Sequence, residues 1–159
     1  CAASLEHWLH HRVLHDSVTR PWDQRNRAAF ASSEAMPDQA ETLVVFSTAN
    51  FNEIGIRTLA GEYVEVGQNH GRKYYRKTER IPGMEGMDIF LYYWDDRDST
   101  EFQGWWFGDA LGGTQVWSRH RMQSQRPPAM GWTIPWDGPV RPELCIMSKM
   151  EKQNCDKAA

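Results

Sequence analysis

The sequence lacks any long hydrophobic run. Its longest apolar segments, 43–46 and 89–94, have the length of single strands, whereas a helix that crosses a bilayer needs about 20 apolar residues. We therefore expect the chain to have no transmembrane segment of its own and to be either soluble or peripheral to a membrane complex.

Cysteine is scarce, and no stretch of the sequence is strongly basic. The three cysteines, Cys1, Cys145 and Cys155, have no C-x-x-C spacing, so they indicate neither a disulfide framework nor a zinc knuckle; a Cys145–Cys155 bridge stays open. The formal net charge of −3 is spread along the chain. Because no stretch has the clustered positive charge that binds a phosphate backbone, nucleic acid is not expected as the main partner.

Motifs of the common catalytic centres are missing as well. The sequence has no G-x-S-x-G turn and no glycine-rich phosphate loop, and His120 has no recognisable Ser or Cys partner. We therefore expect no enzymatic activity and no bound cofactor.

A group of acids is the best remaining candidate for chemistry. Its members are Asp95, Asp96, Asp98, Glu101 and Asp109. Such carboxylates can hold calcium or, in pairs, hydrolyse glycosides. The group lacks the residue order of an EF-hand, and Arg97 stands among the acids as an internal partner. A hydrogen-bonded turn is the favoured interpretation, with calcium and catalysis as alternatives.

Tryptophan is the residue that the sequence has in excess, with eight in 159 residues. Six of them lie close together: Trp94, Trp105, Trp106, Trp117, Trp132 and Trp136. Short aromatic or alternating segments around them are separated by Gly and Pro turns, which is typical of an all-β fold. We predict a small antiparallel meander or barrel-like sheet of about five to seven short strands over residues 42–138.

Large aromatic side chains are needed in the core of so small a module. The expected core residues are Tyr63, Tyr75, Leu91, Tyr93 or its neighbour Tyr92, Trp117 and Trp132. Trp105 and Trp106 occupy adjacent strand positions, so their side chains should point to opposite faces of the sheet. We favour core packing for the aromatic group and keep one of this pair as a candidate partner-binding surface.

Two terminal extensions flank the module. Residues 1–41 include a short helix at about 4–15, and residues 139–159 predict an irregular polar tail. The helix carries an apolar stripe formed by Leu5, Trp8, Leu9 and Val13. Because so short a helix is marginal alone, we expect the stripe to bind a partner, with Trp8 as the anchor.

Three histidines, His7, His11 and His15, lie along one face of the same predicted helix. A spacing of four residues is a recognised geometry for a metal site, and a neutral imidazole can also bind the magnesium of a chlorophyll. The H-E-x-x-H order is absent, since Trp8 follows His7. A solvated polar face is therefore the favoured interpretation, with contact to a metal or a pigment as the alternatives.

The order of the aromatic and glycine motifs resembles a known module. The matching residues are Gly61, Tyr63, Asn69, Gly71, Arg72, Tyr75, Leu91, Tyr92, Tyr93, Trp94, Trp105, Trp106, Phe107, Gly108, Gly112, Gly113, Pro128 and Trp132. The chain is similar to a small Tyr/Trp-rich β module found in many predicted proteins of algae and other protists, above all in its longer dinoflagellate form. The resemblance covers about residues 42–138 and implies a fold and a lineage, since the family has no agreed activity.

These observations favour a non-catalytic accessory subunit or interaction module bound to other protein subunits of a larger complex. The sequence begins at Cys1, which we interpret as a removed presequence or a fragment. Together with the resemblance, this suggests a first hypothesis for the assembly, which is a chloroplast photosynthetic supercomplex. The chain would then be peripheral to the thylakoid membrane. The alternative is a carbohydrate-binding module that stacks sugars on an exposed Trp.

Overall fold

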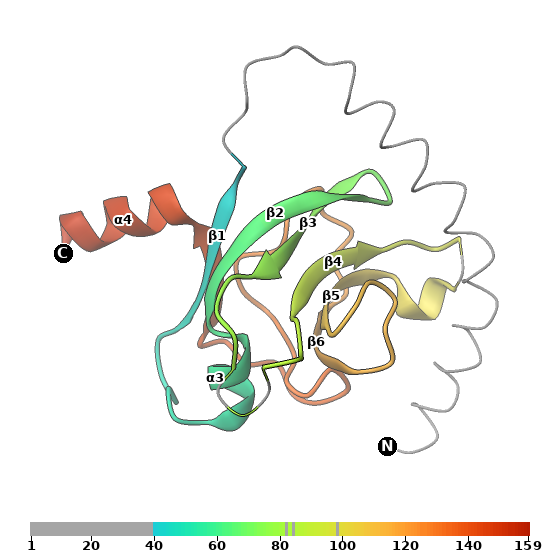
Figure 1. Ribbon diagram of the computed structural model, residues 1–159, viewed down its shortest axis with the longest axis horizontal. Coiled ribbons are helices and arrows are strands. Elements are labelled where there is room, and N and C mark those ends of the chain that lie inside the picture. The colour runs from blue at the N-terminus through green and yellow to red at the C-terminus, as the bar shows by residue number, and fades with distance from the viewer. Residues whose placement is uncertain (1–39, 82, 84, 98) are drawn as a thin grey trace, which may run out of the picture. The chain divides into compact units, whose positions relative to one another are not determined.

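Seven antiparallel strands form one curled sheet, a half-barrel, in the computed structural model of the protein (Figure 1). The structure describes residues 40–159 except 82, 84 and 98. The strands are β1 (Thr42–Ser47), β2 (Gly61–Asn69), β3 (Arg72–Lys77), β4 (Phe90–Trp94), β5 (Gly104–Gly108), β6 (Val116–His120) and β7 (Leu144–Ser148). Their order across the sheet is β6-β5-β4-β3-β2-β1-β7. The predicted all-β antiparallel fold is confirmed.

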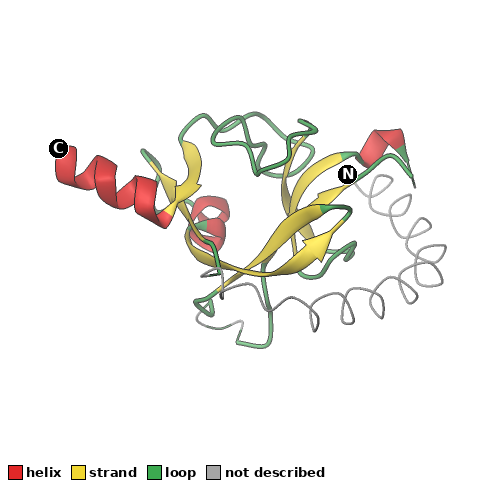
Figure 2. Ribbon diagram, turned by 90° about the horizontal axis from the view of Figure 1, so that it is seen from above, coloured by secondary structure: helices red, strands yellow, loops and turns green. Residues whose placement is uncertain are grey.

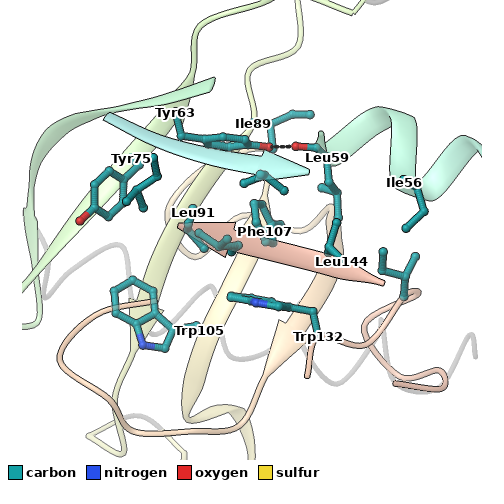
Figure 3. Close-up of a cluster of buried hydrophobic side chains, with 14 of the residues drawn as sticks. Ile56, Leu59, Tyr63, Tyr75, Ile89, Leu91, Trp105, Phe107, Trp132 and Leu144 are labelled. Atoms are coloured by element: carbon teal, nitrogen blue, oxygen red, sulfur yellow. Dashed lines mark hydrogen bonds between the residues drawn. The ribbon is translucent and has the colours of Figure 1, made fainter. Parts of the chain in front are cut away.

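Short helical elements connect or follow the strands. They are α3 (Ile54–Leu59), the 3-10 turn η1 (Thr100–Phe102) and α4 (Lys149–Ala158). α3 lies between β1 and β2 and buries Ile56 and Leu59. The buried phenol of Tyr63 on β2 donates a hydrogen bond to the Leu59 carbonyl at 2.7 Å (Figure 3), which ties the end of α3 to the sheet.

The hairpin between β2 and β3 forms where the sequence predicts a turn. Its two central residues, His70 and Gly71, have φ values of 51° and 72°, and both central positions of a type I′ turn require positive φ. Asn69 and Arg72 pair across the turn. The turn type therefore sets the register of the hairpin.

The main hydrophobic core lies on one face of the curled sheet (Figure 3). Its residues are Leu43, Val45, Ile56, Leu59, Tyr63, Tyr75, Ile89, Leu91, Tyr93, Trp105, Phe107, Trp132, Ile134, Leu144 and Ile146. They include Tyr63, Tyr75, Leu91, Tyr93 and Trp132, so these core predictions are confirmed. Trp117 is partly buried against the same cluster.

A second aromatic cluster lies on the opposite face of β4 and β5. Trp106 contacts Phe102 of η1 and Trp136, with ring centroids 6.4 Å and 5.7 Å away. The Arg119 guanidinium lies over the Trp106 ring at 4.6 Å. All five residues of β5 and four of the five residues of β4 are buried, and η1 and the Trp136 segment cover Trp106 on this face.

The structure differs from the sequence prediction after residue 138. Strand β7 pairs with β1, with Val45 opposite Ile146 and Phe46 opposite Cys145. Helix α4 follows it, begun by a capping box between Ser148 and Glu151, and Figure 2 shows it projecting beyond the sheet. The expected irregular tail is therefore corrected to an edge strand and a capped helix. α4 buries none of its side chains.

The predicted helix at 4–15 lies outside the described residues. The same holds for its stripe, Leu5, Trp8, Leu9 and Val13, and for His7, His11 and His15. In the part of the chain that the structure describes, no helix is long and apolar enough to span a membrane.

Candidate interaction surface

The two tryptophans predicted as a partner-binding surface are both buried. Trp105 is 0% exposed and Trp106 is 1% exposed. Their indole N–H groups are bound on different faces: Trp105 donates to the Ser124 carbonyl at 3.1 Å and Trp106 to the Phe102 carbonyl at 2.8 Å. The predicted opposite orientation is therefore correct, but neither ring offers a surface, because the chain covers both faces of β5.

Large apolar side chains are exposed elsewhere. Those of the described residues are Phe51, Ile54, Val66, Met122, Met130, Val140 and Met150. Phe51, Ile54 and Val140 are 63%, 80% and 57% exposed, and each stands one or two positions from a member of a single ion pair, Glu53–Arg141. We call this group, Phe51, Ile54 and Val140 around Glu53 and Arg141, the α3 patch.

A bidentate ion pair brings the two halves of the α3 patch together. The two terminal nitrogens of Arg141 each lie 2.5 Å from one carboxylate oxygen of Glu53. The same guanidinium donates to Glu143 through Nε at 3.0 Å and Nη2 at 2.6 Å. Arg141 thus binds two carboxylates at once. Such bidentate, charge-assisted hydrogen bonds are strong, and they fix the orientation of the groups that they join.

The loop before α3 is held by the same network. Asn50, with φ of 57°, donates to the Glu143 carboxylate at 2.9 Å, and Glu53 N–H donates to the Asn50 carbonyl at 3.0 Å. Thr48 N–H donates to the Glu143 carbonyl at 3.0 Å. Residues 48–53 are therefore tied to the segment that leads into β7.

The electrostatics of the network favour its charged form. Hydrogen bonds from Asn50 and Arg141 lower the pKa of Glu143 to about 2. The hydrogen bond from Arg141 also lowers the pKa of Glu53, and both carboxylates raise the pKa of Arg141. All three side chains are thus ionised at neutral pH.

Close packing fixes α3 beneath the patch. A Cβ added at Gly55 would come within 2.7 Å of the Ile134 side chain, so the helix backbone lies directly on that residue. Ile56 and Leu59 are buried below it, while Ile54 points to solvent. The exposed apolar groups therefore stand on a rigid base.

The α3 patch has the anatomy of a protein-binding surface. Its exposed apolar side chains, Phe51, Ile54 and Val140, stand beside Arg141, and arginine is among the residue types that contribute most to binding energy in interfaces. A surface that is already rigid loses little conformational entropy on association. Nothing in the sequence points to this patch, because its two halves are about 90 residues apart and meet only in the fold.

The acidic loop forms the hydrogen-bonded turn that the sequence favours. Asp95 accepts from the Arg97 backbone N–H at 3.1 Å and from Arg97 Nε at 2.7 Å, and His70 Nδ1 lies 2.9 Å from its carboxylate. Burial acts to raise the pKa of Asp95, but the bonds from Arg97 outweigh it and the pKa is lowered. Within residues 40–159, apart from the three gaps, no group of three or more His, Cys, Asp or Glu is placed to hold a metal; Asp98 is one of the gaps.

Cys145 and Cys155 are free thiols in the structure, the first buried in β7 and the second exposed on α4. Burial raises the pKa of the Cys145 thiol. Its Sγ lies 3.6 Å from the Glu143 carbonyl. A bridge between the two cysteines, which the sequence left open, is therefore not present.

In comparisons with known proteins, no family model, curated protein or solved structure matches this chain. The resemblance to the Tyr/Trp-rich β module of algae and other protists stays a prediction.

Proposed function

We propose that the protein is a non-catalytic interaction module that serves as an accessory subunit of a larger assembly and binds a protein partner through the α3 patch. The observation that carries this proposal is the exposure of Phe51, Ile54 and Val140 around the Glu53–Arg141 ion pair. Apolar groups clustered on a surface are a common mark of a protein interface.

The aromatic side chains favour a structural module over a sugar-binding one. Trp105 and Trp106, the platform that carbohydrate binding would use, are buried. The predicted contact through Leu5, Trp8, Leu9 and Val13 is kept as a second, separate attachment to the partner. A chloroplast location at the periphery of the thylakoid membrane rests on the resemblance alone.

The test compares native assemblies of two full-length variants in the cells from which the chain comes. The first is the double variant Phe51→Ser, Ile54→Ser; the matched control is Met150→Ser, which removes another exposed side chain, on α4. We expect the double variant to leave the large assembly and to run at the size of the free chain on native gels. The Met150 variant should assemble normally.

Thermal unfolding of both purified variants controls for folding. Because the substituted side chains are exposed, we expect changes in unfolding free energy within about 0.5 kcal/mol. Assembly of the double variant at the normal size would contradict the α3 patch as the binding surface.

A further inference from the structure

His120, the last residue of β6, lies where three parts of the fold meet. It pairs with Trp105 of β5, and its ring meets the edge of the Trp132 ring at a centroid distance of 5.5 Å. The side chain is half-buried. His120 therefore lies at the end of an edge strand, beside two core tryptophans. A change in its protonation state would change the contacts made there.

The imidazole joins the two ends of one loop. Nδ1 accepts a hydrogen bond from the Met122 N–H at 3.1 Å. Because Nδ1 is the acceptor, the neutral ring carries its proton on Nε2, and the Met130 backbone acts to raise the pKa of the ring. Gly131 has φ of 95°, and a Cβ there would come within 2.7 Å of Nε2, so glycine permits this close approach.

The loop in question, residues 121–131, closes the half-barrel between its edge strands; we call it the closing loop. Its Ser124 carbonyl accepts from Trp105 Nε1 at 3.1 Å and from Arg72 Nε at 2.8 Å. Its Ala129 carbonyl accepts from Ile146 N–H of β7 at 2.9 Å. The closing loop therefore covers the Trp105 side of the core and connects β6 to β7.

We infer that His120 is an acid-sensitive latch whose protonation breaks the hydrogen bond that holds the start of the closing loop, at Met122, against the end of β6. An imidazolium carries a proton on both nitrogens, so Nδ1 can no longer accept from Met122 and two N–H groups would face each other. The proton comes from solvent and forms an N–H bond at Nδ1; no other covalent bond is made or broken. This inference is independent of the proposed function, since the α3 patch lies on other residues.

Burial disfavours the imidazolium. It lowers the pKa of His120 by more than the Met130 backbone raises it. Arg119 and Arg121 flank His120 on the chain, but the Arg119 guanidinium lies over Trp106 on the opposite face. Arg72 and Arg126 are the cations at the closing loop. The carboxylate that reaches the loop, Glu41, is engaged by Arg126 and by the Tyr75 phenol.

The sign of the effect follows from this lowered pKa. An opened or unfolded state has a histidine pKa of about 6.5, so below this pH it takes up the proton before the closed state does. Closed-state stability is complete above about pH 6.5 and falls as the pH drops toward the lower pKa of the closed form. The latch therefore holds at neutral pH and loosens in mild acid.

The test measures hydrogen exchange of residues 122–131 in the full chain at about pH 7.5 and about pH 5, expressed as protection factors. We expect protection to fall roughly tenfold in acid for each unit by which the pKa is lowered. In His120→Asn, which offers Met122 an acceptor and does not titrate, this fall should be absent. His70→Asn is the matched control, since Asn tolerates the positive φ of His70, and it should keep the fall.

A ring titration of the wild-type protein by NMR keeps the inference testable if His120→Asn folds poorly. The expected His120 pKa is below 6.5, with Met122 and Met130 amide shifts following the same curve. A pKa at or above about 6.5, unchanged protection in acid, or the same loss of protection in His120→Asn would each overturn the latch.

Discussion

Trp105 and Trp106 illustrate what adjacent strand positions can and cannot reveal. Their alternation follows from backbone geometry alone, and the structure places their indole N–H groups on Ser124 and Phe102, on opposite faces of β5. Whether a face is wet depends on what covers it. The covering elements, η1 and the Trp136 segment, are too short and irregular for their position to be derived from sequence.

Truncation of either tryptophan should destabilise the protein severely. We expect Trp105→Ala and Trp106→Ala each to lower the free energy of unfolding by about 3–5 kcal/mol, because each leaves a cavity in a closely packed cluster. Phe51→Ala, an exposed aromatic position, should change it by less than about 0.5 kcal/mol. Urea unfolding followed by far-UV circular dichroism measures all three. A small effect at Trp106 would mean that the second cluster is not part of the folded core.

At the scale of elements, strands with clear alternation or turn chemistry were predictable and β7 was not. The β2–β3 hairpin follows from Asn69, His70 and Gly71 at the turn. In β7, an apolar run of only a few residues follows Pro142 and precedes a polar helix. So short a run carries no periodicity, and its partner β1 lies about 100 residues earlier, so nothing local identifies the pairing.

Two truncations separate the roles of β7 and α4. Removal of residues 149–159 should move the thermal midpoint by no more than about 4 °C, because α4 buries no side chain. Its contacts with the sheet include the exposed ion pair Lys149–Glu62 and the Lys152 ammonium over the Phe46 ring, and each is worth little at the surface. Removal of 144–159 also deletes Leu144 and Ile146, both in the core. At about 2–5 kcal/mol each, their loss approaches the whole stability of a typical domain.

Differential scanning calorimetry of the two truncated proteins decides between these outcomes. The shorter deletion should give one cooperative transition near that of the full chain, and the longer deletion should give none. A cooperative transition in the protein that ends at residue 143 would show that β7 is dispensable.

At the scale of the whole molecule, residues 40–159 form a compact unit by themselves, whereas the predicted module covers residues 42–138. At the N-terminal end the difference includes Glu41, which accepts a hydrogen bond from the Tyr75 phenol at 2.9 Å. Fold class and most of the core were accessible from composition and alternation; the α3 patch was not, because long-range pairing creates it.

Deletion of residues 1–39 should leave the remaining unit folded. We expect an unchanged thermal midpoint, because residues 40–159 contain a large hydrophobic core and form a compact unit by themselves. Recovery with the assembly should weaken if Leu5, Trp8, Leu9 and Val13 form the second attachment. Size-exclusion chromatography and thermal unfolding of the 40–159 fragment test the first point, and native gels test the second. Unfolding of the fragment would assign the N-terminal residues to the domain core.

The pairing of β1 with β7 has a consequence for synthesis on the ribosome. Val45 leaves the ribosome about 100 residues before Ile146, its partner, and translation at about 5–20 residues per second makes this an interval of roughly 5–20 s. Throughout it, one edge of β1 has unpaired N–H and C=O groups that can recruit another nascent chain. Because this pairing joins residues so far apart in the sequence, we expect the growing polypeptide to be prone to association through β1 until β7 has been made.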